Sequence, residues 1–156
     1  MEPYATVEYA DTYLTVQIDT GVWSGADVTD KERALVTATV RIDALSGYGA
    51  GLRGCKADSE QPREFPRSPD SSIPDAVMRA CCHEALALLE QAQDKTAAGR
   101  QKAIQQGVTS VSIGGVSESY AKLSDMQNGL RGCLLSDIAI DLIRPYLAVQ
   151  GVFPIV

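Results

Sequence analysis

Aromatic residues are scarce in this sequence, and histidine is almost absent. The 156 residues include one tryptophan, two phenylalanines, six tyrosines and a single histidine, His83. With so few rings, aliphatic side chains and alanine must fill most of the core. Apolar residues still make up 45% of the chain and charged residues 22%, an ordinary globular composition. A chain of this length predicts a single domain, residues 1–156, with a real core.

Motifs for catalysis and for metal or cofactor binding are missing. One histidine and no nucleophile elbow leave no readable Ser-His-Asp triad. The sequence has no HExxH, EF-hand or zinc-ligand spacing, and Gly114-Gly115 lacks the pattern of a phosphate-binding loop. His83 beside Glu84 has no nearby nucleophile or second ligand in the sequence. We therefore expect no enzyme activity, no cofactor and no metal site.

Long apolar runs and a secretion leader are also missing. No run of 18 apolar residues occurs, which predicts no membrane-spanning helix. The start, MEPYATVEYA, has neither the basic nor the apolar region of a secretion signal, so we expect synthesis in the cytoplasm. The cysteines show no CxxC spacing and are interpreted as small thiols in a reducing compartment rather than as disulfides or metal ligands. They are Cys55, Cys81, Cys82 and Cys133.

Positive charge is in deficit. The chain has 14 lysines and arginines against 20 acidic residues, for a formal net charge of -6. Proteins that grip nucleic acid through its phosphates normally show a basic patch. The balance argues against wrapping of DNA, although it leaves room for a local basic strip. It would suit a surface past which DNA moves without sticking.

Apolar spacing predicts a mainly α fold, a small bundle of about four helices. The first helix has Thr6 as its N-cap, and the second starts with a capping box from Thr29 to Glu32. The third helix is apolar over so much of its girth that it should be central to the bundle. The expected helices cover residues 7–18, 29–45, about 73–93 and 130–144.

The helical patterns also predict which side chains are buried. In the second helix, Leu35, Ala38, Ile42 and Leu45 form one apolar stripe. Three charged residues of this helix, Lys31, Arg41 and Asp43, are expected to be able to stay in water. In the other helices the predicted apolar faces include Val7, Ala10, Leu14 and Ile18 in the first, and Leu135, Ile138 and Leu142 in the last.

Residues 46–73 form a connector that is longer than most loops in compact domains. Within it, residues 61–68, QPREFPRS, hold two prolines, two arginines and a phenylalanine. We expect Phe65 to act as a peg into the core. Arg63 and Arg67 are expected to project elsewhere, either into solvent or to a contact with another subunit, where arginine is enriched.

Two further segments need a partner. Residues 104–121 are expected to contain a short β-hairpin, because valine, serine and threonine surround Gly114-Gly115. Residues 148–156 form an apolar tail. This tail either folds back over its own bundle or inserts into a groove on a neighbouring subunit, and we favour insertion. Its candidate interface residues are Phe153, Ile155 and Val156.

The ordered set of these features resembles the head-tail connector, or adaptor, proteins of long-tailed bacteriophages and prophages. The resemblance covers almost the whole chain, and each stretch alone is a weak motif. The stretches are YATVEYADTYL, ERALVTATVRIDAL, QPREFPRS before IPDAVMRACCHEALALLE, VSIGGVSESY, and LIRPYL.

The resemblance implies a structural protein of the virion, located at the head-tail junction after synthesis in the bacterial cytoplasm. Such a protein assembles as a twelve-fold ring below the portal vertex, extends the DNA channel and receives head-closure or tail proteins. It has no enzyme activity and no cofactor, and DNA passes through it without specific binding. Some relatives are labelled DnaT-like single-stranded-DNA-binding proteins, which gives an alternative function. The acidic charge and the lack of a basic, aromatic-studded groove argue against that alternative.

Overall fold

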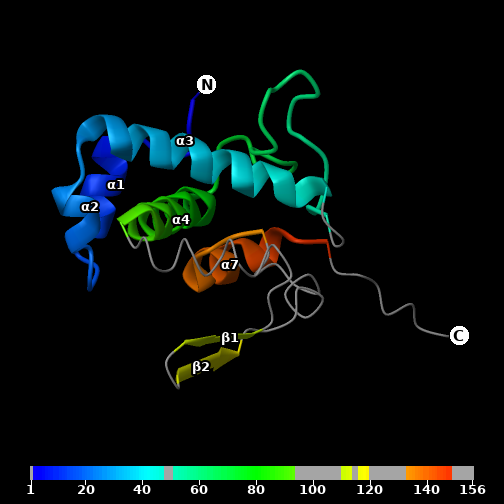
Figure 1. Ribbon diagram of the computed structural model, residues 1–156. Coiled ribbons are helices and arrows are strands. Elements are labelled where there is room, and N and C mark those ends of the chain that lie inside the picture. Colours follow the sequence, from blue (N-terminus) through cyan, green and yellow to red (C-terminus); the bar gives the residue numbers. More distant parts are fainter. Residues whose placement is uncertain (1, 48–50, 94–109, 114–115, 120–132, 149–156) are drawn as a thin grey trace, which may run out of the picture.

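A computed structural model describes residues 2–47, 51–93, 110–113, 116–119 and 133–148 (Figure 1). Within these ranges the protein is mainly helical, as predicted. The α-helices are α1 (Val7–Leu14), α2 (Gly21–Gly25), α3 (Val28–Ala44), α4 (Asp75–Gln93) and α7 (Asp137–Ile143). Two 3-10 turns, η1 (Leu45–Gly47) and η3 (Arg144–Tyr146), follow α3 and α7, and the strands are β1 (Ser110–Ile113) and β2 (Val116–Ser119).

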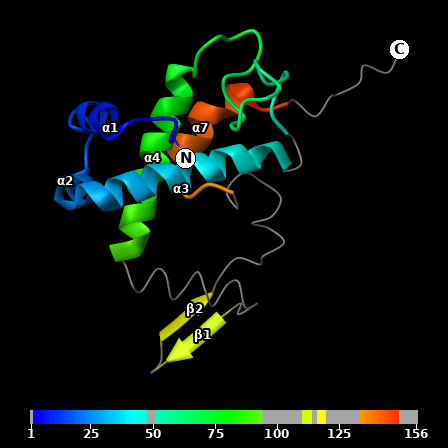
Figure 2. The ribbon, with the colours of Figure 1, turned by 90° about the horizontal axis from the view of Figure 1, so that it is seen from above.

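Helix α4 is central to the bundle, which confirms the expectation from its wide apolar girth. Figure 1 shows α4 between α3 and α7, and Figure 2 shows that α3 crosses over it. Small side chains dominate the buried surface of α4: Ala80, Cys81, Cys82 and Ala85 are each fully buried. Because these side chains are short, the neighbouring helices can pack closely on both sides of α4.

The N-terminal region departs from the prediction in length. Thr6 is the N-cap of α1, as expected, and its side-chain oxygen accepts a hydrogen bond of 3.2 Å from the N–H of Tyr9. However, α1 ends at Leu14, so the predicted extension to residue 18 is wrong. Ile18 is 96% exposed instead of buried. The unpredicted short helix α2 begins at Gly21 and brings Trp23 into the core.

Helix α3 shows what apolar spacing predicts well and what it cannot predict. Its stripe of Leu35, Ala38, Ile42 and Leu45 is buried, as expected. The N-cap is Asp27 rather than Thr29: the Asp27 carboxylate accepts a hydrogen bond of 3.4 Å from the N–H of Thr29. Apolar periodicity thus located the buried face, whereas the start of the helix depended on which polar side chain reached the free N–H groups.

Lys31, Arg41 and Asp43 of α3 do not stay in water, and the expectation for these three residues is wrong. Lys31 is only 9% exposed and pairs with the carboxylate of Asp11 at 2.9 Å. Arg41 and Asp43 also form ion pairs with other parts of the chain, which are described below. Each of these side chains meets a partner from outside its own helix, and helical periodicity carries no information about such partners.

The predicted buried face of the last helix is wrong at Ile138, whereas Leu142 does pack against the core. Helix α7 begins after Ser136, whose hydroxyl oxygen accepts a hydrogen bond of 3.2 Å from the N–H of Ala139. The buried residues are Ala139, Ile140 and Ile143, whereas Ile138 is 54% exposed. Leu135 precedes the helix. An apolar stripe that starts at Leu135 therefore predicts the wrong centre for the buried face of α7.

The segment expected to hold a hairpin is described in part. Strands β1 and β2 pair antiparallel, with the register running from Ser110 opposite Ser119 to Ile113 opposite Val116. The other residues of 104–121 lie outside the described ranges. Of the tail, only Ala148 is described: its N–H donates to the carbonyl of Gly51 at 3.1 Å. The predicted tail contacts of Phe153, Ile155 and Val156 lie outside the described residues.

None of the helices in the described ranges is both long enough and apolar enough to cross a lipid bilayer.

Candidate functional site

The strap, defined here as residues 61–68, closes back on the loop that precedes it. An isolated antiparallel bridge joins Lys56 to Arg67. The backbone hydrogen bonds beside this bridge run from Ala57 N–H to Pro66 O at 3.0 Å and from Ser68 N–H to Cys55 O at 2.8 Å. The strap is therefore one arm of a closed loop rather than a loose link between α3 and α4.

The base of this closed loop requires glycine. Gly54 has a φ of +70°, in the left-handed region that side chains rarely adopt. A Cβ atom there would lie 2.9 Å from the carbonyl oxygen of Ser68, which is a backbone atom and cannot rotate away. We conclude that the close approach of the two arms depends on the missing side chain.

Phe65 anchors the strap in the core, which confirms its prediction as a peg. The residue is 2% exposed. Its ring meets the rings of Tyr4 and Tyr146 edge to face, at centroid distances of 5.8 Å and 5.5 Å. Its N–H donates to the hydroxyl oxygen of Tyr4 at 3.1 Å. The strap is thus joined to the N-terminal segment and to the turn after α7 at one point.

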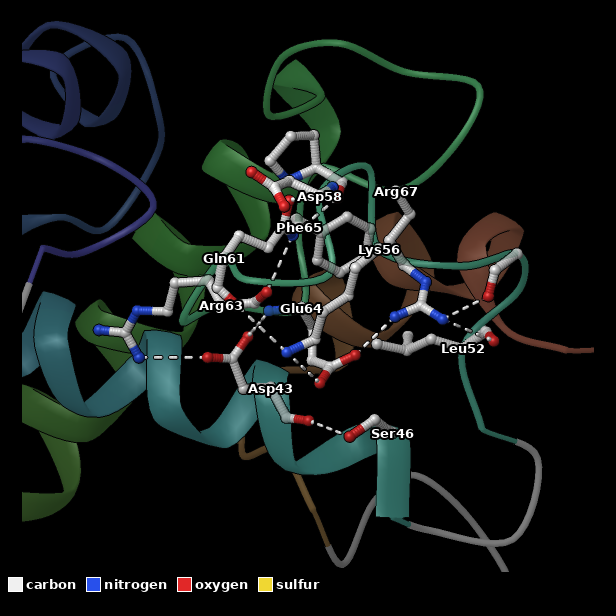
Figure 3. A network of polar contacts seen from close by, with 12 residues as sticks. Asp43, Ser46, Leu52, Lys56, Asp58, Gln61, Arg63, Glu64, Phe65 and Arg67 are labelled. Atoms are coloured by element: carbon white, nitrogen blue, oxygen red, sulfur yellow. Dashed lines mark hydrogen bonds and ion pairs between the residues drawn. The ribbon is translucent and has the colours of Figure 1, made fainter.

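Arg63 is held on the side of the strap that faces α3 (Figure 3). Its Nη1 atom lies 3.1 Å from Asp43 Oδ2, and its Nε and Nη2 atoms donate to the carbonyl of Glu2 at 3.2 Å and 2.9 Å. Asp43 also accepts hydrogen bonds from the Tyr4 hydroxyl and from the Glu64 N–H. Burial and the bond to Asp43 raise the pKa of Tyr4, so its hydroxyl remains a donor.

Arg67 is held at the other end of the strap. Its Nη1 atom lies 2.5 Å from Glu64 Oε2. Its remaining donors point to backbone carbonyl oxygens of the preceding loop (Figure 3). These carbonyls belong to Leu52, Arg53 and Gly54. A guanidinium that satisfies three carbonyls and a carboxylate is a structural crosslink of the loop.

The expectation that Arg63 and Arg67 project away from their own bundle is therefore wrong. Each side chain is only 12% exposed, and each bonds to groups within the chain. Two prolines and a buried ring predicted a stiff segment, but the direction of its arginines depended on partners that lie as many as 61 residues away. Sequence spacing alone carries no signal for those partners.

Replacing both strap arginines with alanine is expected to destabilise the protein. The double change Arg63→Ala and Arg67→Ala removes charge-assisted hydrogen bonds and takes the arginine partners from the partly buried carboxylates of Asp43 and Glu64, at a cost of about 2–4 kcal/mol. Urea melts monitored by circular dichroism provide the measurement. The matched control is Arg33→Ala with Arg144→Ala, which removes two exposed arginines that pair within their own helical turns. Equal midpoints for the two double variants would contradict the structural role.

A second polar site joins α3 and α4 to the start of α7, and we call it the Glu84 clamp. Glu84 is fully buried, and its carboxylate lies 3.0 Å from Arg41 Nε. The carboxylate oxygens accept from the N–H groups of Leu135, at 2.9 Å and 3.1 Å, and Ser136, at 3.0 Å. Arg41 Nε also donates to the carbonyl of Cys133 at 3.0 Å. The clamp thus holds the main chain that leads into α7.

The surroundings of Glu84 act on its pKa in opposite directions. Burial raises its pKa, while the two N–H donors and Arg41 oppose that shift. The sequence showed no nucleophile or second ligand near Glu84 and predicted no function for it. A carboxylate between apolar neighbours in α4 was the available signal, but its partners come from α3 and from the segment before α7.

A third site lies where α1 packs on α4, and we call it the tyrosine face. It comprises Tyr9, Tyr13, Asp75, Arg79 and His83. The rings of Tyr9 and Tyr13 are one helical turn apart, with an interplanar angle of 21° and a centroid distance of 6.3 Å. The guanidinium carbon of Arg79 lies 5.5 Å from the centroid of the Tyr13 ring. Both tyrosines are half-buried, and Arg79 is exposed.

Hydrogen bonds fix the side chains of the tyrosine face. The Tyr9 hydroxyl donates to Asp75, which also pairs with Arg79 at 2.5 Å. The Tyr13 hydroxyl lies 3.0 Å from Nε2 of the buried His83, and the two rings meet edge to face. Both rings are therefore held in place before any ligand arrives.

Charge on the tyrosine face is confined to one ion pair. Burial, with the bond to Asp75, raises the pKa of Tyr9 to about 12, and burial raises the pKa of Tyr13. Burial lowers the pKa of His83, which favours the neutral imidazole. At neutral pH the charges of the face are thus those of Asp75 and Arg79 alone.

The basic residues elsewhere in the described ranges are already paired. Every lysine and arginine there except Arg53 forms an ion pair with a carboxylate. Arg53 donates to the carbonyl of Pro145 at 3.1 Å. This part of the chain therefore offers little free positive charge to a phosphate backbone.

Metal and disulfide chemistry find no support within the described ranges. These residues contain no group of three or more histidine, cysteine, aspartate or glutamate side chains arranged to hold a metal ion. The four cysteines are free thiols, with Cys81 and Cys82 buried, Cys133 half-buried and Cys55 exposed.

A family model described as "Putative DnaT-like ssDNA binding protein" matches residues 1–151. No curated protein and no solved structure matches the chain.

Proposed function

This chain belongs to the family described as "Putative DnaT-like ssDNA binding protein", and on that premise we propose that it binds single-stranded DNA. The extent of the match carries the proposal, since it includes every helix of the described bundle. The tyrosine face supports it, because aromatic rings and arginine are the groups on which unpaired bases stack.

The charge arrangement limits the strength of this binding. The net charge is -6, and in the described part of the chain every lysine and arginine except Arg53 is paired with a carboxylate. These described residues can then neutralise few phosphates, so base stacking rather than counterion release would provide most of their affinity for DNA. We accordingly propose weak binding with a shallow dependence on salt.

Fluorescence anisotropy with a labelled single-stranded oligonucleotide tests this function. We expect a Kd of roughly 10 µM at physiological salt, and a log–log salt slope between about −1 and −2. Duplex DNA of the same sequence is the control, and it should bind more weakly because its bases are already stacked. No measurable binding at protein concentrations up to about 200 µM, which is above the usual range of non-specific dissociation constants, would overturn the proposal.

A structural adaptor at the head-tail junction of a phage is the second candidate function. The stretches that resemble adaptor proteins, which occur in the same order along nearly the whole chain, favour this function. The acidic net charge also favours it, because a negatively charged channel wall does not retain DNA. In that function the chain would form a ring, twelve-fold in the virion, and contact the portal and the head-closure or tail proteins. The family description names single-stranded DNA and no adaptor, so we place this candidate second. Co-sedimentation with a purified portal protein is its test, and failure to co-sediment would contradict it.

A further inference from the structure

We propose that the tyrosine face is the site where bases of single-stranded DNA stack, an inference that rests on the DNA-binding function above. The occupant would be one or two unpaired bases together with the phosphate that joins them. The bases would contact the exposed parts of Tyr9 and of the Arg79 guanidinium, and the phosphate would contact Arg79.

The location of the other aromatic rings supports this choice. Tyr4, Trp23 and Phe65 are each no more than 3% exposed, so their rings cannot accept a base without unfolding the core. Tyr146 packs edge to face on Phe65. Among the described residues, the tyrosine face is therefore where two neighbouring rings and an arginine reach the surface together.

The geometry of the two tyrosines suits stacking. Tyr9 and Tyr13 are nearly parallel, and both are anchored through their hydroxyl groups to α4. Because the rings are already ordered, a base does not have to immobilise them on binding. A ring of this kind accepts any base, since every base has a π-face. The site is therefore expected to prefer single strands without preferring a sequence.

Arg79 adds a contact that the tyrosines cannot provide. Its side chain is 47% exposed, and its partner Asp75 is 50% exposed. A phosphate that approaches Arg79 competes with the Asp75 carboxylate for the guanidinium and is repelled by that carboxylate. This competition explains why a site with suitable rings would still bind weakly. It also predicts that removing the charge of Asp75 strengthens binding.

Substitutions on the face test the inference in the full-length protein. Tyr9→Leu and Arg79→Gln should each weaken binding of a labelled single-stranded oligonucleotide by about 5- to 20-fold, the lower part of the range expected for loss of one stacking contact. Tyr9→Phe keeps the ring and should remain within about twofold of the wild type. Asp75→Asn should tighten binding by about threefold, because an opposing charge is removed.

A matched control separates the site from general charge effects. Arg144, in the turn that follows α7, also pairs with an aspartate one turn away, Asp141, and its side chain is 68% exposed. Among the described residues, the arginine that lies over a tyrosine ring is Arg79 and not Arg144. Arg144→Gln changes the net charge as Arg79→Gln does, and should leave the affinity within about twofold. A thermal melt of each variant checks that the variant still folds.

The source of the affinity is tested with the oligonucleotide itself. An oligonucleotide of the same length with abasic residues keeps the phosphates and loses the stacking surfaces, so its binding should fall about tenfold or more. If the wild type binds DNA and the Tyr9 and Arg79 variants bind equally well, the tyrosine face is not the site, and the DNA-binding function stands. If the wild type binds no DNA at all, both the DNA-binding function and the base-stacking site are contradicted.

Discussion

Replacing Phe65 with alanine is expected to lower the free energy of unfolding by about 3–5 kcal/mol. The ring is 2% exposed and makes edge-to-face contacts with Tyr4 and Tyr146. Its removal leaves a cavity between the strap, the N-terminal segment and the turn after α7. Backbone hydrogen bonds from Ala57 N–H to Pro66 O and from Ser68 N–H to Cys55 O hold the strap against the preceding loop. The strap therefore cannot readily collapse into that cavity.

Equilibrium urea denaturation followed by circular dichroism measures this effect. Ile138→Ala is the control, since Ile138 is 54% exposed and its truncation should cost about 0.5 kcal/mol or less. Phe65→Leu keeps much of the apolar volume and should fall between the two. A loss below about 1 kcal/mol for Phe65→Ala would contradict the role of the ring as the anchor of the strap.

Replacing Glu84 with alanine is expected to cost about 3–5 kcal/mol, the effect of breaking a buried ion pair by removing one partner. The change leaves the partly buried Arg41 without its carboxylate and the N–H groups of Leu135 and Ser136 without their acceptor. The start of α7 should then separate from α4 more readily than the rest of the bundle. Faster amide hydrogen exchange in α7 is the local measurement, and a urea melt is the global one.

Two further variants assign the contributions within the Glu84 clamp. Glu84→Gln keeps an oxygen acceptor for the N–H groups and removes the charge, so its loss should be smaller than that of Glu84→Ala. The double change Glu84→Ala with Arg41→Ala should cost less than the sum of the single changes, because no unpaired charge remains. Strict additivity of the two single changes would show that the 3.0 Å contact contributes no coupling.

Local patterns in the sequence were enough to predict the helical framework. The apolar stripe of α3, the central place of α4 and the Thr6 cap of α1 were all predicted correctly. Each depends on residues within a few positions of one another, where helical geometry alone decides which side chains share a face. Phe65 was predicted for a related reason: a large ring between two prolines has few uses other than burial.

Only the tertiary structure decided where the polar side chains point. Arg63 reaches Glu2 across 61 residues, and the Tyr9 hydroxyl reaches Asp75 across 66. The tyrosine face and the Glu84 clamp exist because helices distant in sequence pack together. Local sequence patterns do not predict which side chains of such helices come into contact. A charged side chain can remain in water or find a distant partner, and the packing of α1, α3, α4 and α7 determines which of these happens.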